Sequence, residues 1–345
     1  MASLLSLDVS KAFDRVSHVR LAHNLRKRRI PESLVKWVED FLSSRRTEVK
    51  VNDFILPEAL VSVGIPQGSL ISPILYLFYN ADLLESCESI RLRTSATGFV
   101  DDVNILTYSE STEQNCKKLA EIHEQCQKWA RKHGSQFCPD KYELIHFSRT
   151  KKKFNMSAEV RLEGQSVGPK TDIRILGVRL DSALRWQAHM RSVEAKAVHM
   201  VNALRTITGS TWGCSLEAGK QVYETAVRPA ITYAASVWHT PEGVKGHRKG
   251  ISAKLQKIQG KCLRTIAGAY KATSTEALEV ETFTLPLDLH TEKLAARTVV
   301  RIRTTKAATG IKAACDRIRR QTVERRGRHA IPRSSLLDRT NAWTA

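Results

Sequence analysis

The chain has 345 residues, 42% hydrophobic and 26% charged, which is the composition of a globular protein rather than of a disordered or fibrous one. No run approaches the roughly 18 apolar residues of a membrane span, the first ten residues lack a secretory pattern, and seven scattered cysteines without Cys-x-x-Cys argue against a disulfide framework or zinc knuckle. The 55 Lys and Arg against 35 Asp and Glu, a net charge of +20, predict a polyanionic partner, with a basic surface for solubility or for an anionic membrane as the alternatives.

The chain begins with a predicted strand. Residues 2–9 are apolar and end in an acid, so the strand places Asp8 at its edge. Helical spacing of apolar residues follows, and Pro31 then opens a second predicted helix. The apolar face expected for this second helix consists of Leu34, Trp37, Val38 and Phe41. Two alternating runs on either side of Asn52-Asp53 predict a hairpin.

A glycine-containing loop at residues 64–69 leads into a segment that is apolar nearly all round, which predicts a buried helix. Two β-favouring runs then flank Asp101 and Asp102, which predicts a strand, a tight turn and a second strand. The two carboxylates should stand at the tip of that turn. Further on, Ser111 and Gln114 form the capping box of an amphipathic helix.

Strands give way to helices in the second half of the chain. Residues 142–147 and 158–180 are predicted to be extended, whereas residues 186–229 and 251–267 are predicted to be mainly helical. We therefore expect three regions, at residues 1–184, residues 185–290 and residues 291–345. The last of these is a basic tail, either a solvated arm or a nucleic-acid contact.

Three features, the strand ending in Asp8, the glycine-containing loop at residues 64–69 and the Asp101-Asp102 turn, indicate a chemical function together that none indicates alone. By itself an Asp-Asp pair is usually a turn, a strand-end Asp is as often a helix cap, and the glycine loop is as often a plain turn. Phosphoryl transfer uses two divalent ions roughly 4 Å apart, held by carboxylate oxygens. Because adjacent strands lie about 4.8 Å apart, acids from two neighbouring strand ends can share two ions. The combination predicts a metal-dependent site at Asp8, Asp101 and Asp102.

Several segments resemble a known family. LSLDVSKAFDRV, GIPQGSLISPILYLFYNADL and TGFVDDV resemble motifs A, B and C of reverse transcriptases, in the family's order, and ILGVRLDSALRW resembles the primer-grip segment. The resemblance covers residues 3–240 and points to polymerases of non-LTR (LINE-like) retrotransposons, particularly the fungal type. It implies an α+β fold: a right-hand polymerase palm, with an antiparallel sheet and packed helices, followed by a helical thumb-like region.

The resemblance implies a catalytic centre. Asp8 and Asp101 would coordinate two Mg²⁺ ions, with Mn²⁺ as an alternative, Asp102 would support the site, and the backbone carbonyl of Val9 would add a ligand. The reaction implied is RNA-directed DNA synthesis, in which a DNA primer is extended on an RNA template with dNTPs. Lys141 matches the motif D lysine, a candidate general acid for the departing pyrophosphate, with a solvent-facing lysine as the alternative.

The resemblance also assigns residues that contact substrates. Phe13 matches the steric gate, where an aromatic ring excludes a 2′-hydroxyl and so favours deoxynucleotides; a core Phe is the alternative. Gln67 and Gly68 match the loop that contacts the incoming nucleotide and the template, with a helix-entry turn as the alternative. Leu176 and Gly177 fall in the primer-grip hairpin, where a glycine allows close backbone approach to the primer end.

Basic residues in the helical region would follow the phosphates and sugars of the template–primer duplex, so that binding depends on salt and little on sequence. These residues are Lys196, Arg205, Lys220, Arg228 and Arg248.

In the family the fingers come before motif A, and Met1 stands close before Asp8. The sequence therefore predicts a truncated polymerase, largely without fingers and with weak or absent activity. Two other classes stay open. One is a non-catalytic nucleic-acid-binding remnant of such an element, and the other is a different palm enzyme, such as an intron maturase or an RNA-dependent RNA polymerase; Phe13 argues against the RNA polymerase. Because such elements copy their RNA at nicked chromosomal DNA, nuclear localisation is expected.

Overall fold

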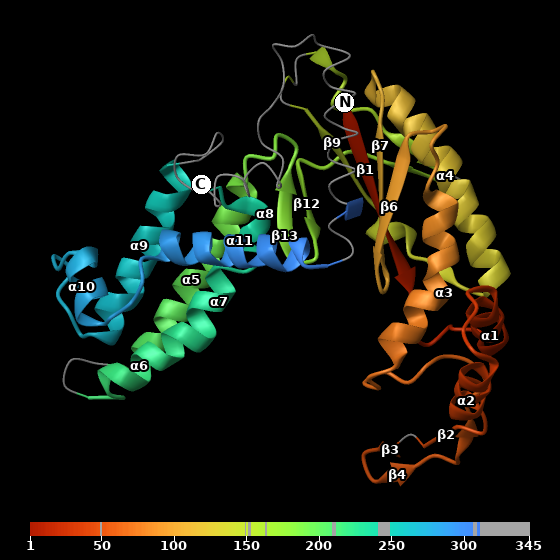
Figure 1. Ribbon diagram of the computed structural model, residues 1–345, viewed down its shortest axis with the longest axis horizontal. Coiled ribbons are helices and arrows are strands. Elements are labelled where there is room, and N and C mark those ends of the chain that lie inside the picture. Colours follow the sequence, from red (N-terminus) through yellow and green to blue (C-terminus); the bar gives the residue numbers. More distant parts are fainter. Residues whose placement is uncertain are drawn as a thin grey trace. The chain divides into compact units, whose positions relative to one another are not determined.

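The computed structural model describes residues 1–48, 50–148, 150, 153–162, 164–208, 212–240, 249–305 and 309–310. The chain divides into two compact units, Met1–Arg185 and Trp186–Ala345 (Figure 1). Helices and antiparallel sheets together make the fold α+β, as expected. Among the residues described, no helix is both long and apolar enough to cross a membrane.

A five-stranded antiparallel sheet lies at the centre of the first unit. Its strands are β1 (Ala2–Ser10), β6 (Thr94–Phe99), β7 (Asp102–Tyr108), β8 (Gln136–Phe137) and β9 (Glu143–Phe147). Strand β7 pairs with one edge of β1, and β6 pairs with the outer edge of β7. Strands β8 and β9 pair with the other edge of β1. The predicted first strand and the predicted strand–turn–strand are confirmed.

Alternation along β1 separates the two faces of the sheet. Leu5, Leu7 and Val9 are almost fully buried and share one core with helices α3 (Ser72–Cys87) and α4 (Thr112–His133). The intervening residues of β1 therefore face away from these two helices.

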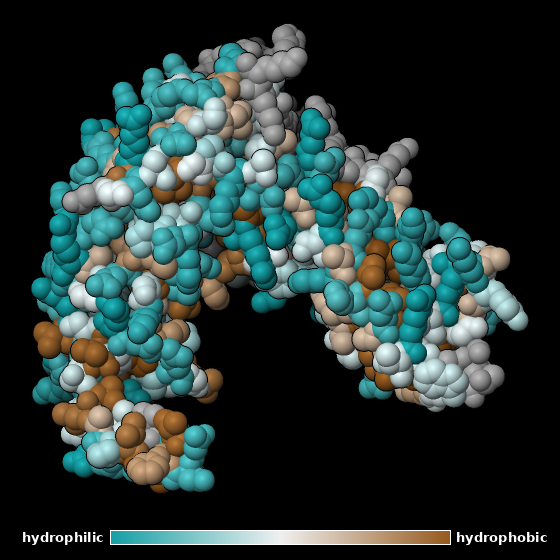
Figure 2. Space-filling model, turned by 180° about the vertical axis from the view of Figure 1, so that it is seen from behind, coloured by the Kyte–Doolittle hydropathy of each residue, from teal (hydrophilic) through white to brown (hydrophobic). Residues whose placement is uncertain are grey.

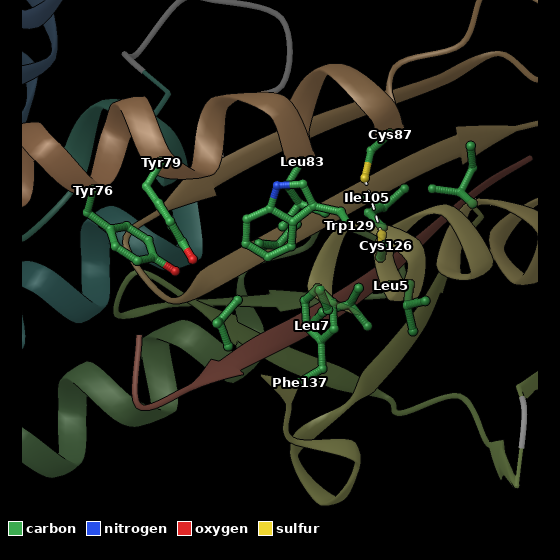
Figure 3. Close-up of a cluster of buried hydrophobic side chains, with 14 of the residues drawn as sticks. Leu5, Leu7, Tyr76, Tyr79, Leu83, Cys87, Ile105, Cys126, Trp129 and Phe137 are labelled. Atoms are coloured by element: carbon green, nitrogen blue, oxygen red, sulfur yellow. Dashed lines mark hydrogen bonds between the residues drawn. The ribbon is translucent and has the colours of Figure 1, made fainter. Parts of the chain in front are cut away.

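Aromatic side chains of α3 and α4 fill this core (Figure 3). Tyr79 of α3 and Trp129 of α4 meet edge to face with their ring centroids 6.0 Å apart. The prediction that α3 is a buried helix is only partly confirmed: one face is buried, but Ile74 and Leu77 on the other side are 53% and 58% exposed. Helix α4 begins as predicted, because Ser111 Oγ accepts a hydrogen bond from the amide of Gln114.

Two helices and two nested pairs of short antiparallel strands lie between β1 and α3. They are α1 (His18–Lys27), α2 (Glu32–Leu42), the pair β2 (Arg46–Thr47) and β5 (Ala59–Leu60), and the pair β3 (Lys50–Val51) and β4 (Phe54–Ile55). The predicted hairpin around Asn52 is confirmed. The apolar face predicted for α2 is partly wrong: Val38 is buried, but Leu34 and Trp37 are about half exposed, while Val35 and Leu42 pack inward. Figure 2 shows apolar side chains on the surface of this end of the unit.

Two further hairpins complete the first unit. They are β10 (Val160–Leu162) with β11 (Gln165–Val167), and β12 (Asp172–Ile175) with β13 (Val178–Asp181). Ile173 of β12 packs with Leu4 and Ile145 in a small second core. Because Leu4 projects from the face of β1 away from α3 and α4, this hairpin covers part of that second face.

The second unit is helical. Its elements are α5 (Gln187–Arg205), α6 (Leu216–Val222), the π-helical turn η3 (Tyr223–Val227), α7 (Arg228–Ile231), α8 (Ala235–Trp238), α9 (Lys249–Ile266), α10 (Thr275–Glu281) and α11 (Leu287–Arg303). Tyr223, Trp238 and Leu255 are buried in its core. Pro229, whose ring nitrogen cannot donate a helical hydrogen bond, follows η3 and accounts for the locally widened helix.

The end of the second unit departs from the predicted tail. The expected boundary at residue 291 falls inside α11, which continues to Arg303 because Leu287, Thr291 and Ala295 recur at helical spacing and are buried. Most of the predicted tail, and Arg248, lie outside the described residues.

Two buried histidines make the stability of the first unit depend on pH. His133 and His146 are 2% and 1% exposed, and burial lowers the pKa of each imidazole. Nε2 of His146 lies 2.9 Å from the carbonyl of Ala158, to which it donates, so Nδ1 accepts from Ser3 Oγ at 2.7 Å and the neutral ring uses both nitrogens. Protonation therefore favours the unfolded chain. The stability that the two neutral histidines contribute is fully present above the ordinary histidine pKa of about 6.5, and it is lost as pH falls below that value.

We expect the free energy of unfolding, measured by urea titration, to fall between about pH 7 and pH 5. His146→Gln keeps a polar side chain that does not titrate, so its profile should fall less steeply than that of the natural chain. Equal slopes for the two proteins would contradict this role for His146.

Candidate active site at the ends of strands β1 and β7

The pairing of β1 with β7 brings two carboxylates opposite one another. In this register Asp8 lies across from Asp102, and residues directly opposite in an antiparallel pair project to the same face with Cβ atoms roughly 4.5–5.5 Å apart. Since Leu7 and Val9 point into the core, Asp8 and Asp102 leave the sheet on the face away from α3 and α4. The side chain of Asp8 is 17% exposed.

Asp101 stands in the two-residue turn between β6 and β7. Val100 before it has a φ of 54°, in the left-handed region that a β-branched residue rarely adopts. Two hydrogen bonds hold the turn: Nδ2 of Asn80 donates to the carbonyl of Val100 at 3.3 Å, and the amide of Val9 donates to the carbonyl of Asp101 at 2.9 Å. These bonds fix Asp101 at the end of β1, beside the pair formed by Asp8 and Asp102.

The carboxylates act on each other electrostatically. The pKa of Asp102 is raised first by partial burial and then by the negative charges of Asp101 and Asp8. The pKa of the buried Tyr76 hydroxyl is also raised, mainly by burial, with contributions from Tyr79 and from the same two carboxylates. Like charges therefore gather where β1 and β7 end, an arrangement that a bound cation relieves.

Lys141 approaches this cluster from a distant part of the chain. It ends the 3₁₀ turn η1 (Pro139–Lys141), and its Nζ donates to Asp8 Oδ2 at 3.0 Å. The hydrogen bond to Asp8, followed by the attraction of that carboxylate, raises the pKa of Lys141. Its side chain is 62% exposed, so the lysine faces solvent and is ion-paired at the same time.

The loop at residues 64–69 is fastened to the segment that follows β1. The amides of Gly64 and Ile65 donate to the carbonyls of Val16 and Phe13, each at 2.8 Å. Gly64 has a φ of +87°, and a Cβ at this position would lie 2.8 Å from the backbone oxygen of Asp14. Only a glycine allows the two segments to approach this closely.

Side chains add to this attachment. Gln67 is exposed, and its Nε2 donates to Asp14 Oδ1 at 2.9 Å, while Nε2 of His18 lies 2.7 Å from the carbonyl of Gly64. An open pocket of about 660 Å³ lies beside the loop, and its lining includes Asp14, Gln67 and Arg45. Gly68, with a φ of +89°, has open space around the position of a Cβ.

Phe13 is half-buried between the loop and the core. Its ring centroid lies 5.5 Å from that of Tyr76 at an angle of 57°, and its carbonyl accepts the hydrogen bond from Ile65. This placement suits both interpretations of Phe13, because the ring contacts core side chains and lies beside the loop that carries Gln67.

Leu176 and Gly177 form the two-residue turn of the β12–β13 hairpin. Their φ angles of 45° and 84° are those of a tight hairpin turn that requires positive φ at both positions. Leu176 is 46% exposed at the tip. The hairpin packs beside Leu4, on the same face of β1 as Asp8.

The structure thus joins Asp8, Asp101, Asp102 and Lys141 at one end of the sheet. Across the described part of the chain, no group of three or more His, Cys, Asp or Glu side chains is arranged so that it could already hold a metal ion. The donor set nevertheless fits a hard divalent cation, because carboxylates of two paired strands face the same side and repel each other. Carboxylate oxygens are the ligands that Mg²⁺ prefers.

Sequence reasoning missed the residues that hold these groups in place. Asp14 and His18 fasten the loop, and Asn80 fastens the turn that carries Asp101. Asn80 could have been found, since a polar side chain inside an apolar helix needs a partner when it is buried, and Asn80 is 4% exposed. Asp14 and His18 had no such signal, because their partners lie far along the chain.

Comparison with known proteins identifies the family. Residues 2–180 match the family described as reverse transcriptase (RNA-dependent DNA polymerase). The chain is 26% identical over 264 residues to the probable RNA-directed DNA polymerase from transposon X-element of Drosophila melanogaster, covering 76% of this chain and 28% of that protein. It is 26% identical over 270 residues to the RNA-directed DNA polymerase from mobile element jockey of the same organism, with the same two shares. The chain therefore spans about 28% of the length of these curated relatives.

Among solved structures, apo telomerase from Candida tropicalis aligns with 89% of this chain and 52% of that chain, at 11% identity and a TM-score of 0.38. The family match covers more than half of the 345 residues. The relatives from mobile elements are of the non-LTR, LINE-like kind. This chain belongs to the reverse transcriptase family.

Proposed function

We propose that this chain is the palm and thumb portion of the RNA-directed DNA polymerase of a non-LTR retrotransposon of the fungal type. The observation that carries the proposal is the meeting of Asp8, Asp101 and Asp102 at paired strand ends, with Lys141 bound to Asp8. The substrates are a DNA primer, an RNA template and dNTPs, and the site of action is the nucleus. Since the chain spans about 28% of its curated relatives, activity, substrates and partners are all part of the proposal.

Asp8 and Asp101 would hold two Mg²⁺ ions, or Mn²⁺, with Asp102 and the carbonyl of Val9 in support. Bound there, the ions would neutralise charge on the triphosphate and orient the attacking and leaving oxygens. The protein contributes positioning, because backbone hydrogen bonds hold the segments of Asp8 and Asp101 together. Lys141 Nζ would carry the proton for the departing pyrophosphate.

Substrate contacts fall to the segments beside the carboxylates. Gln67 and Gly68 would meet the nucleotide and template, with the Gln67 amide held by Asp14. Phe13 would lie under the sugar, and the turn of Leu176 and Gly177 would contact the primer end.

In the second unit, Lys196 and Arg205 are exposed and suit contacts to phosphate. Lys220 and Arg228 have partners within the protein, since Lys220 Nζ donates to the carbonyl of Phe283 at 3.4 Å and Arg228 pairs with Glu224 at 3.2 Å. Arg228 is therefore a weaker candidate for nucleic-acid binding than its sequence suggests.

The decisive experiment is primer extension on an RNA template with dNTPs and Mg²⁺. It compares the natural chain, an Asp101→Ala Asp102→Ala double variant, and a chain preceded by the fingers segment of a related element. Synthesis by either of the chains with intact carboxylates, absent from a matching double variant, would support the polymerase.

The net charge of +20 favours one other function, a non-catalytic nucleic-acid-binding remnant. Salt-sensitive duplex binding without synthesis in any version would support that remnant instead.

Replacing Phe13 by Ala tests the steric gate. Removing the ring opens space for a 2′-hydroxyl, so the ratio of ribonucleotide to deoxynucleotide incorporation should rise by about ten-fold or more, measured in single-nucleotide extension. Phe13→Tyr keeps the ring and should leave the ratio unchanged. If Phe13→Ala lowers the melting temperature and overall rate without changing the ratio, Phe13 is a core residue.

A further inference from the structure

The ion pair between Lys141 and Asp8 joins an exposed cation to a largely covered anion. Lys141 Nζ lies 3.0 Å from Asp8 Oδ2, and the two side chains are 62% and 17% exposed. Among the described residues, this is the only ion pair formed by Asp8, Asp101 or Asp102. The cluster of like charges therefore has one protein cation in direct contact.

The backbone beneath the lysine is fastened to β1. The amide of Cys138 donates to the carbonyl of Asp8 at 2.9 Å, and the amide of Lys141 donates to the carbonyl of Cys138 at 3.1 Å. Just after the turn, Tyr142 is 6% exposed and its hydroxyl lies 3.1 Å from Nε2 of His123. The turn η1 is thus anchored at both ends, and the exposed side chain of Lys141 extends from this fixed backbone to Asp8.

The two cations of the proposed function would compete with Lys141 for the Asp8 carboxylate, because the ammonium already contacts one of its two oxygens, Oδ2. Mg²⁺ binds carboxylate oxygen at about 2.0–2.1 Å, whereas the ammonium accepts a distance of 3.0 Å from Oδ2. Two positive charges on one oxygen repel each other. Because the lysine side chain is flexible and exposed, it can leave without any change in the backbone.

We propose that Lys141 is the resident counter-ion of the carboxylate cluster and that a divalent cation displaces its ammonium group from Asp8. This inference rests on the proposed function, since it needs a cation site at Asp8. In this role Lys141 acts through Asp8: it competes with the cation and so lowers the affinity of the site for it. When the cation binds, the Lys141 ammonium is released from Asp8 and becomes free beside the site. Binding of the lysine ammonium and binding of the cation at Asp8 are thereby mutually exclusive.

The test measures Mn²⁺ binding, by electron paramagnetic resonance of the free ion, for the natural chain and for Lys141→Met. Removal of the competing ammonium should raise Mn²⁺ affinity by about two- to five-fold, which is the range expected for a partly exposed ion pair. Lys141→Arg retains a cation and should bind Mn²⁺ like the natural chain. Lys170→Met is the matched control, because Lys170 pairs with Glu143 at 2.7 Å in the same unit, with side-chain exposures of 53% and 29%. Its Mn²⁺ affinity should equal that of the natural chain.

A second measurement follows the lysine itself. Brief acetylation read by mass spectrometry should label Lys141 faster when Mg²⁺ is added, whereas labelling of Lys170 should not change. This readout uses the natural chain and so does not depend on how any variant folds.

The possible outcomes separate the two proposals. If Mn²⁺ binding is lost in Asp8→Asn, but Lys141→Met binds like the natural chain and Mg²⁺ does not alter labelling, the counter-ion role is wrong and the cation site stands. If Asp8→Asn and Asp101→Asn both bind Mn²⁺ like the natural chain, the cation site of the proposed function is wrong and the counter-ion role is overturned with it. Tighter binding in Lys141→Met together with faster labelling supports the exchange.

Discussion

Asp101→Asn is expected to lower the rate of nucleotide incorporation by about 10³-fold or more, while the chain stays folded. The amide keeps the size of the carboxylate but removes the charge that would bind a cation. Asp101 is fixed at the site through its backbone carbonyl, which accepts a hydrogen bond from the backbone amide of Val9. This contact does not involve the Asp101 side chain. The loss should therefore be chemical and not structural.

The same substitution should slightly raise the melting temperature near neutral pH. Partial burial, and after it the charges of Asp101 and Asp8, raise the pKa of Asp102 above its ordinary value. A carboxyl with a raised folded-state pKa contributes stability that is present below its unfolded pKa and is lost as pH rises through the folded value. Removing the charge of Asp101 reduces that loss.

Single-turnover extension and thermal unfolding of the same preparations check both effects, in the version of the chain that extends a primer. Asp53→Asn, at an exposed hairpin turn, is the control for removal of one negative charge. If Asp101→Asn extends primers at the natural rate, Asp101 is not a catalytic residue. A loss of rate with an equal loss in Asp53→Asn would point to net charge instead of the site.

Gly64→Ala is expected to destabilise the first unit by about 2–4 kcal/mol, because strain and a steric clash act together. The residue has a φ of +87°, and the added Cβ would come within 2.8 Å of the Asp14 backbone oxygen, which cannot move as a flexible side-chain end can. Displacing this contact would also weaken the hydrogen bonds from Gly64 and Ile65 to the segment of Phe13. Primer extension should fall with it, since this loop carries Gln67.

Gly68→Ala separates the clash from the backbone strain. Its φ of +89° is close to that of Gly64, but no atom outside Gly68 and its two chain neighbours lies within 4 Å of the added Cβ. The cost should therefore be only about 1–2 kcal/mol, from the left-handed conformation alone. Urea titrations of the two variants measure the difference. Equal destabilisation would mean that the close approach to Asp14 does not matter for stability.

Local structure was largely predictable from neighbouring residues. The apolar run at residues 2–9 predicts β1, the β-favouring runs around Asp101 and Asp102 predict the β6–β7 pair, and Ser111 with Gln114 predicts the start of α4. These signals depend only on residues close in sequence. The identities of the carboxylates also come from local motifs. For α2 the same reasoning failed in part, since periodicity defines an apolar stripe but not which of its residues meet a neighbour.

By itself the sequence indicated the family and the α+β class and named the three carboxylates as candidates, because these depend on motif order and local patterning. Only the tertiary structure decided which distant groups meet: Lys141 with Asp8 across 133 residues, and Gln67 with Asp14 across 53. Such contacts follow from the strand register and from backbone hydrogen bonds between remote segments. No local spacing in the chain encodes them, because each depends on the path of everything folded between the two residues.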